Sequence, residues 1–275
     1  MKTKNLVLPV LMLYVNLATA QSLRYSPATP YISLAAYSRQ QADALSFTGN
    51  QAALARIKNA GAGVFGERRF MLREMAAYTL AAGLPTRLGN VGLQLNYAGF
   101  KNFSENKIGL AYARKLGKLV DVGVQFNYYG YRIPSYGNAS TINFEMGVLL
   151  HLAEKLQAGI QVCNPAGGKL GKNNREKLAS AYKAGMGYDV SDRLFISSEL
   201  IKEEGKAVNV IAGIQYRFEK QFFARAGFSS ASTAAYAGAG IAWKQLRLDV
   251  SSGYHPLLGF SPGILLIMNF KTKAE

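Results

Sequence analysis

The sequence contains few of the residues on which many stable or catalytic folds depend, and each scarcity excludes something. Cys163 is the only cysteine, so no internal disulfide can form. The two histidines, His151 and His255, are far apart and lack Cys or carboxylate neighbours at metal-ligand spacing, so no metal site is predicted. No apolar run of about 18 or more residues occurs beyond the N-terminus, which argues against a helical membrane protein.

The first twenty residues have the pattern of a secretory signal peptide. Lys2 and Lys4 precede an apolar core from Leu6 to Leu17, and the sequence Ala18-Thr19-Ala20 forms an A-x-A cleavage site. The apolar core is too short for a transmembrane anchor, and no cysteine follows the cleavage site for lipid attachment. We therefore expect an exported protein that is cleaved after Ala20.

Alternation of apolar with polar or small residues dominates the rest of the chain. Between Leu119 and Tyr131, the apolar residues Val120, Val122, Val124, Phe126 and Tyr128 alternate with Asp121, Gly123, Gln125 and Asn127. Successive side chains of a strand point to opposite faces, so one face here is apolar and the other polar. The pattern recurs in about fourteen segments, at roughly 59–66, 73–83, 90–101, 106–115, 119–132, 140–152, 156–164, 179–190, 194–203, 207–218, 222–231, 234–243, 246–254 and 261–271.

These segments predict an all-β fold, an antiparallel transmembrane β-barrel of about 14 strands. Segments of about 9–13 residues are long enough to cross a bilayer as tilted strands. Connections after even-numbered segments are short and those after odd-numbered ones are often longer, like the periplasmic turns and extracellular loops of outer-membrane barrels. Many segments end in Tyr or Phe, which suits aromatic girdles at the membrane interfaces. A soluble β-sandwich, the alternative, explains neither these ends nor the export signal.

The segment from Gln21 to Lys58 differs from everything after it. It does not alternate, contains Pro27 and Pro30, and is too irregular to face lipid. A barrel of this size is wide enough to need a plug. We therefore expect a signal peptide over 1–20, an N-terminal luminal hatch over 21–58 and a transmembrane barrel over 59–275, in a bacterial outer membrane.

Together, the irregular segment and the strands resemble the long-chain fatty-acid transporter (FadL) superfamily. The element TGNQAALA, from Thr48 to Ala55, is similar to the family's hatch motif, and the phrases VFGERRF and IGLAYARKLG look most like the PorV/PorQ branch of Bacteroidota-type bacteria. The resemblance implies a fourteen-stranded barrel with a hatch in its lumen. The usual hatch motif is Asn-Pro-Ala, whereas this chain has Asn50, Gln51 and Ala52 and so lacks the proline.

The alternation also predicts a polar set on the luminal face. If the pattern holds, these side chains point inward: Gln94, Asn96, Gln125, Asn127, Lys183, Arg217, Arg247 and Asp249. Two interpretations stay open for them. They form either a hydrogen-bonded filling that anchors the hatch, which we favour, or a path for a solute.

Basic residues gather in two of the connections that the loop pattern places outside the cell. They are Arg68, Arg69 and Arg73 in the first, and Lys169, Lys172, Arg175 and Lys177 in the second. Guanidinium groups suit phosphate, so these residues are candidates for contacts with lipopolysaccharide or with a protein partner. A solvated charged rim is the alternative. The formal charge of +16 would otherwise suggest nucleic acid, but export makes anionic lipid headgroups the better match.

The sequence presents no nucleophile with a partner base and no phosphate loop in a strand–loop–helix context, so we expect neither an enzyme nor a cofactor. The first hypothesis, implied by the PorV/PorQ resemblance, is a non-enzymatic subunit or scaffold of an outer-membrane export or assembly complex of the type IX secretion kind. The alternative, implied by the FadL resemblance, is a transporter of small hydrophobic molecules. A general porin ranks third, because a plugged lumen conducts poorly.

Overall fold

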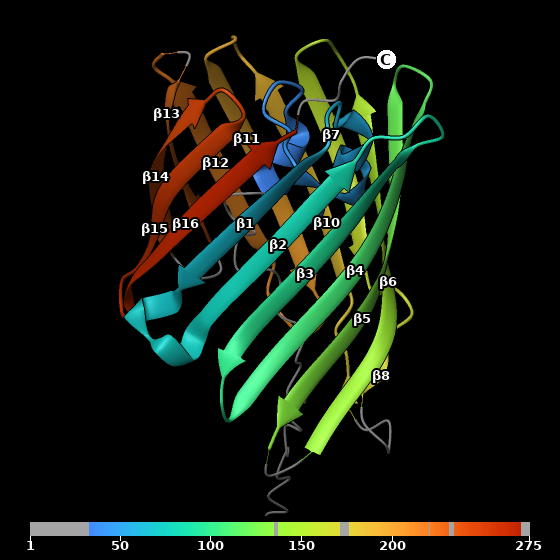
Figure 1. Ribbon diagram of the computed structural model, residues 1–275, viewed down its shortest axis with the longest axis vertical. Coiled ribbons are helices and arrows are strands. Elements are labelled where there is room, and N and C mark those ends of the chain that lie inside the picture. The colour runs from blue at the N-terminus through green and yellow to red at the C-terminus, as the bar shows by residue number, and fades with distance from the viewer. Residues whose placement is uncertain (1–32, 135–136, 171–175, 220, 231–233, 271–275) are drawn as a thin grey trace, which may run out of the picture.

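The computed structural model describes residues 33–134, 137–170, 176–219, 221–230 and 234–270. The predicted signal peptide, Lys172, Arg175 and the tail after Phe270 lie outside these ranges. Fourteen strands form a closed antiparallel barrel in which each strand pairs with its sequence neighbours, β7 pairs with β10, and β1 pairs with β16 to close the ring (Figure 1). The predicted all-β, fourteen-stranded fold is therefore confirmed.

The strands of the barrel begin and end within a few residues of the predicted segments. They are β1 (Gly61–Arg68), β2 (Ala76–Leu84), β3 (Asn90–Phe100), β4 (Phe103–Leu116), β5 (Val120–Ile133), β6 (Gly137–His151), β7 (Leu156–Cys163), β10 (Ala181–Asp189), β11 (Leu194–Glu203), β12 (Asn209–Arg217), β13 (Phe222–Ser229), β14 (Ala234–Trp243), β15 (Leu246–His255) and β16 (Gly259–Asn269). A short separate sheet, β8 (Lys169–Leu170) with β9 (Glu176–Lys177), lies in the longest connection, where no strand was predicted.

Side chains of β5 show how the wall is built. Val124, Phe126 and Tyr128 are 37%, 62% and 49% exposed on the outside. Gln125 and Asn127, which lie between them in sequence, are 0% and 1% exposed on the inside. The apolar face of the strand is thus the outer face, the reverse of a soluble sheet that buries its apolar side.

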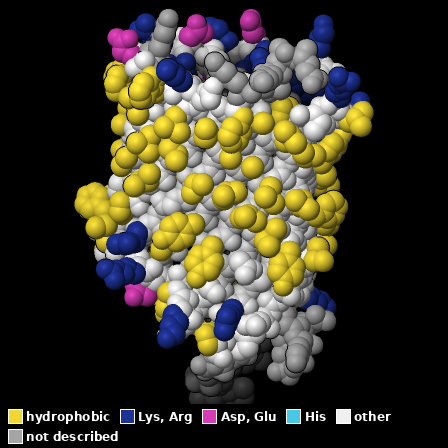
Figure 2. All heavy atoms as spheres, in the orientation of Figure 1, with side chains coloured by type: hydrophobic (Ala, Val, Ile, Leu, Met, Phe, Trp, Pro, Cys, Tyr) yellow, Lys and Arg dark blue, Asp and Glu magenta, His cyan; other side chains and the backbone are white. Residues whose placement is uncertain are grey.

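Exposed apolar side chains form a broad band around the wall, with Lys and Arg gathered toward its two edges (Figure 2). The ring system of Trp243 and the side chains of Leu110 and Ile142 are among the most exposed, at 63%, 65% and 73%. An apolar surface of this extent needs a non-aqueous neighbour, and the hydrocarbon region of a bilayer fits a closed barrel. Within the described residues, no helix has the length and apolarity to cross a membrane.

Three short 3-10 helices precede β1 and lie inside the ring of strands. They are η1 (Ser33–Tyr37), η2 (Ser46–Thr48) and η3 (Gln51–Arg56), and Figure 1 places them near the end of the barrel that carries the C-terminal end of β16. Residues 33–57 are called the luminal segment below. Two further 3-10 turns, η4 (Arg69–Met71) and η5 (Arg73–Met75), lie in the β1–β2 connection.

The fold explains why the last strand, β16, has apolar side chains on both faces. Its outward residues Ile264 and Leu266 join the apolar band, at 57% and 43% exposure. Its inward residues Leu265 and Ile267 are 4% and 1% exposed, in one apolar cluster with Leu45 of the luminal segment. The lumen is therefore partly an apolar core, where the luminal segment packs against the wall.

Candidate functional site in the barrel lumen

The residues of the predicted hatch motif fix the luminal segment to β6 and β7. Asn50 is the N-cap of η3, because its Oδ1 accepts the backbone N–H of Ala52 at 3.0 Å. Its Nδ2 donates to the carbonyl oxygens of Ile160 and Val148, at 3.1 and 3.4 Å. One asparagine thus starts the helix and joins it to two strands of the wall. Position 51, where the motif of the FadL superfamily has proline, is Gln51 in this chain, and its side chain makes hydrogen bonds of its own.

Glycines face each other across neighbouring strands where the luminal segment approaches the wall. The strand register pairs three sets: Gly83 with Gly92, Gly123 with Gly147, and Gly159 with Gly185. A Cβ on Gly123 would lie 2.4 Å from the carbonyl carbon of Gln51, and one on Gly185 would lie 2.4 Å from Cζ of Tyr37. Only glycine permits such a close approach of a helix to a strand.

A ladder of side-chain hydrogen bonds runs along the inner face from β3 to β5. Gln94 Nε2 donates to Asn96 Oδ1 at 2.7 Å, and Gln125 Nε2 donates to Gln94 Oε1 at 2.9 Å and to Asn127 Oδ1 at 2.7 Å. Gln125 reaches β3 across β4, where Gly109 stands opposite both Gln94 and Asn127 and has no side chain to obstruct the bond. Four of the eight predicted luminal residues therefore belong to one network.

Glu145 on β6 connects this ladder to the luminal segment. Its Oε1 accepts Asn127 Nδ2 at 3.1 Å and also pairs with the ammonium group of Lys107. Its Oε2 accepts Gln51 Nε2 at 2.5 Å, and Gln161 Nε2 donates to Gln51 Oε1 at 3.1 Å. A buried carboxylate is tolerated when it is paired and hydrogen-bonded, as here. Glu145 was not among the predicted luminal residues, although it occupies an inward position of the alternation.

Arg56 ties the two ends of the luminal segment to each other and to β5. Its Nε donates to Asp121 Oδ2 at 3.0 Å, and its Nη1 donates to the carbonyl oxygens of Ala36 and Ser38 at 3.3 and 3.2 Å. Asp121 Oδ2 also lies 2.9 Å from His151 Nε2. Burial lowers the pKa of the Arg56 guanidinium, and the hydrogen bond to Asp121 opposes that shift.

Around η1, the wall supplies two more carboxylates. Tyr37 donates its hydroxyl to Glu199 Oε1 at 2.8 Å, and Ser38 donates its hydroxyl to Asp189 Oδ1 at 2.7 Å. Asp189 Oδ2 accepts the backbone N–H of Arg39 at 3.1 Å. Burial, followed by the negative charge of Glu199, raises the pKa of the Tyr37 phenol well above its usual range. The phenol therefore stays protonated and keeps donating.

A second charged cluster joins the luminal segment to β13 and β15. Arg247 donates to Asp249 through Nε at 3.0 Å and Nη2 at 2.8 Å, and to Asp43 Oδ2 through Nη1 at 3.2 Å. Arg225 also pairs with Asp249. The guanidinium carbons of Arg247 and Arg225 lie 4.5 and 5.3 Å from the ring centroid of Phe223. Two of the predicted luminal residues, Arg247 and Asp249, are found here.

Charge is distributed unevenly between the inside and the outside of the barrel. Among the described residues, eight acidic side chains are buried, namely Glu67, Glu105, Asp121, Glu145, Asp189, Glu199, Glu203 and Asp249. Counted as whole residues, only Lys183 and Arg225 among the Lys and Arg of that part of the chain are buried, and the side chains of Arg56 and Arg247 are 7% and 17% exposed. Most Lys and Arg residues of the described ranges are therefore partly or fully exposed.

The remaining predicted residues lie on the inner face of β10, at the end of β12, at the rim and in β9. Lys183 is 4% exposed on the inner face of β10, and Arg217 is half-buried at the end of β12. Arg68, Arg73 and Lys169 are exposed at the rim opposite the short turns. Arg69 is half-buried and donates from Nε to Glu67 Oε1 at 2.8 Å. Lys177 belongs to β9.

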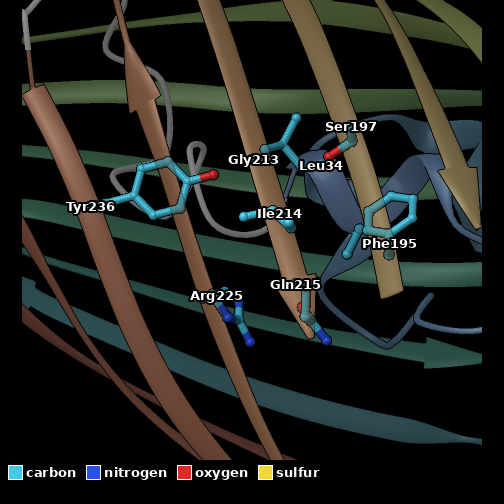
Figure 3. Close-up of a pocket in the computed structure, with 9 residues that line it drawn as sticks. Leu34, Phe195, Ser197, Gly213, Ile214, Gln215, Arg225 and Tyr236 are labelled. Carbon is cyan, nitrogen blue, oxygen red and sulfur yellow. The ribbon is translucent and has the colours of Figure 1, made fainter. Parts of the chain in front are cut away.

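A pocket remains where the luminal segment faces β11 to β14 (Figure 3). Its apolar side comes from Leu34, Ala35 and Phe195, and its other lining residues are Ser197, Gly213, Ile214, Gln215, Arg225 and Tyr236. The luminal segment is thus attached closely to β3–β7 and β10, whereas its edge toward β11–β14 leaves a partly apolar, partly polar space.

The cysteine and the two histidines lie at strand ends. Cys163 ends β7 as a buried free thiol, and His151 and His255 end β6 and β15. Within the described residues, no group of three or more His, Cys, Asp and Glu side chains is placed to hold a metal ion.

Comparison with known proteins identifies the fold and no sequence family. No protein-family profile and no curated protein sequence matches the chain. The toluene transporter TodX of Pseudomonas putida aligns over 83% of this chain and 94% of its own, with a TM-score of 0.62 and 8% identity. A FadL homologue of Pseudomonas aeruginosa aligns over 83% of this chain and 93% of its own, with a TM-score of 0.51 and 12% identity.

The outer membrane protein Omp33 of Acinetobacter baumannii is a third structural neighbour, over 77% of this chain and 98% of its own, with a TM-score of 0.52 and 10% identity. At these identities the likeness concerns the fold alone. The chain shares the fold of these outer-membrane barrels, which include a FadL homologue, and none of the three neighbours is named as an enzyme.

Proposed function

We propose that this chain is an outer-membrane transport protein that passes small, largely apolar molecules through a lumen regulated by the luminal segment. The apolar band and the FadL-type fold support the outer membrane as its location. Export through the signal peptide, with cleavage after Ala20, belongs to the same proposal. So does the orientation in which the short turns face the periplasm.

The pocket between the luminal segment and β11–β14 is the observation on which the transport proposal rests. Leu34 and Phe195 offer an apolar surface, while Arg225 and Tyr236 offer polar groups on the other side. Small-molecule sites combine apolar walls with a few polar groups, as this lining does. The cavity volume is about 20 Å³, so the luminal segment has to move for a hydrocarbon to enter. TodX is described as a transporter of toluene, a small apolar molecule, which agrees in kind with this lining.

Filling this pocket tests the proposal. Ser197 faces the pocket on β11, and its neighbour Ser198 lies on the opposite face of the same strand. We expect Ser197→Phe to slow the uptake of a small aromatic hydrocarbon into proteoliposomes severalfold, whereas Ser198→Phe, with the same added ring on the outer face, leaves uptake unchanged. Equal uptake by both variants and by a protein-free vesicle would contradict transport.

The scaffold hypothesis is the second candidate, and a different observation favours it. Hydrogen bonds from Asn50, Gln51 and Arg56 attach the luminal segment to the wall, and wall glycines let it approach the strands closely. Such close attachment suits a permanent plug. We infer from this that a subunit role in an outer-membrane export or assembly complex, including one of the type IX secretion kind, accounts for the same lumen. In that case the polar set of the lumen is an anchor for the hatch.

Purification distinguishes the two functions. Under the scaffold hypothesis, affinity purification from native membranes in mild detergent recovers a protein partner in fixed stoichiometry. Recovery of the barrel alone, together with saturable uptake of the hydrocarbon, would leave the transport proposal standing and remove the scaffold.

A further inference from the structure

A second surface lies away from the lumen, where β1 meets β16 at the end opposite the short turns. It combines residues 68–75, which include η4 and η5, with the β15–β16 turn at residues 255–259. The N–H of Phe70 donates to Ser261 Oγ at 3.0 Å, and the Phe70 ring meets the His255 ring edge-on with centroids 5.9 Å apart. Closure of the barrel thus brings together two segments nearly 190 residues apart. This surface is called the seam patch.

Aliphatic side chains protrude from the seam patch. Met71 and Leu72 are 63% and 49% exposed, and Leu257 and Leu258 are 88% and 54% exposed. The turn that carries the two leucines is fixed, since His255 Nδ1 accepts their backbone N–H groups at 3.2 and 3.3 Å. Four exposed aliphatic side chains in a fixed arrangement are suited to contact with acyl chains.

The backbone of η4 is held in an unfavourable conformation. Phe70 and Met71 have φ angles of 52° and 61°, the left-handed region that costs a residue with a side chain about 1–2 kcal/mol. Such conformations persist where the surroundings enforce them, and they cluster at binding sites. Here the strained turn carries Met71, whose side chain is 63% exposed.

Arginines lie next to the aliphatic side chains. Arg68 and Arg73 are exposed, and Arg69 is oriented by its bond to Glu67. Glu74 is the one exposed acidic side chain between residues 68 and 75. Figure 2 shows such a cluster of basic side chains with a single acidic neighbour at the lower edge of the apolar band, on the left of the view.

We propose that the seam patch binds a phosphorylated, acylated glycolipid of the outer leaflet, of the lipid A class. The guanidinium groups of Arg68 and Arg73 pair with its phosphates, and Met71, Leu72, Leu257 and Leu258 lie among its acyl chains. Planar guanidinium groups bind phosphate through paired hydrogen bonds, and the aliphatic contacts add area that a free phosphate would not use. The proposal rests on the proposed outer-membrane location and is independent of transport.

Native mass spectrometry of the purified full chain in a neutral detergent tests this assignment, with bisphosphorylated lipid A as the probe. We expect Arg68→Gln/Arg73→Gln to weaken binding at least tenfold. Lys101→Gln/Arg132→Gln, which removes two exposed basic side chains at the same end, should change it less than twofold. Glu74→Gln should tighten binding, because it removes the one exposed negative charge of the patch. Heat-modifiable gel migration checks that each variant is folded.

Binding of different lipids to the purified protein shows which class of phosphate-bearing lipid the seam patch recognises. Removal of one phosphate from lipid A should weaken binding to the wild type, and phosphatidylglycerol should bind at least tenfold more weakly than lipid A. Equal binding of phosphatidylglycerol and lipid A, or an unaltered affinity of the Arg68→Gln/Arg73→Gln variant, would overturn the proposal. Uptake of the hydrocarbon is expected to be the same in all these variants, so failure here is distinct from failure of transport.

Discussion

Replacing Arg56 by methionine should release the luminal segment without unfolding the barrel. The side chains of Arg56 and Asp121 are 7% and 2% exposed, so the substitution leaves the buried carboxylate of Asp121 with His151 as its remaining ion-pair partner among the described residues. Loss of one member of a buried ion pair costs about 3–5 kcal/mol. The carbonyl oxygens of Ala36 and Ser38 lose their donor as well. The whole cost falls on contacts of the luminal segment, because β5 keeps its pairing with β4 and β6.

Hydrogen exchange of the backbone amides measures this release. A loss of about 3 kcal/mol in the free energy of local opening accelerates exchange roughly 150-fold. We expect that acceleration in residues 50–57 and none in the paired strands β12 to β14. The variant Arg56→Met/Asp121→Asn removes the orphaned charge and should exchange about tenfold more slowly than Arg56→Met alone. Unchanged exchange in Arg56→Met, or no recovery in the double variant, would refute the role given to this ion pair.

Two further substitutions test the contacts of the luminal segment. Tyr37→Phe removes the hydrogen bond to Glu199 and should destabilise the segment by about 1–3 kcal/mol, measured by the same exchange experiment. Since the folded pKa of Tyr37 is raised, its neutral phenol contributes stability below pH about 10, and this contribution is lost at higher pH. The wild type should therefore lose protection progressively as the pH rises above about 10, and Tyr37→Phe should lose less; equal losses would contradict the assignment. Gly123→Ala places a carbon against the backbone of Gln51 and should displace η3, whereas Gly66→Ala meets only a tyrosine ring on the outer face. A thermal-stability assay of the two variants that found them equal would contradict the close approach.

Much of the barrel wall could be predicted, because the sequence patterns that indicate it depend on residues close together in the chain. Alternation along β5 depends only on neighbouring residues, and it identified the outward Val124 and Phe126 as well as the inward Gln125 and Asn127. Counting the alternating segments between the turns then predicted the number of strands. Even β16, apolar on both faces, was recognised as a strand, although its reason became clear only from the luminal contact of Ile267.

Pairings inside the lumen could not be predicted because they depend on the register of the closed barrel. Glu145 and Gln51 are 94 residues apart, and no local pattern brings them together. The bond from Tyr37 to Glu199 spans 162 residues. The alternation predicts that Gly123 and Gly147 face inward. That they lie opposite each other follows only from the pairing of β5 with β6. The family motif predicted a hatch residue at Asn50, but it did not predict the hydrogen bonds of Asn50 to the carbonyl oxygens of Val148 and Ile160.

The most direct test of the central claim is a disulfide between the luminal segment and the wall, formed in the membrane. A Cβ built on Gly61 lies 3.6 Å from the Cβ of Ala44, within the range of natural disulfides. In a Cys163→Ser background, we predict that Ala44→Cys/Gly61→Cys forms an intramolecular disulfide on mild oxidation, seen by mass spectrometry of a tryptic digest. Ala44→Cys/Gly259→Cys, with its second cysteine in the turn at the opposite end of the barrel, should not. Two free thiols in the first variant, in a correctly folded barrel, would contradict a luminal segment that lies inside the ring of strands.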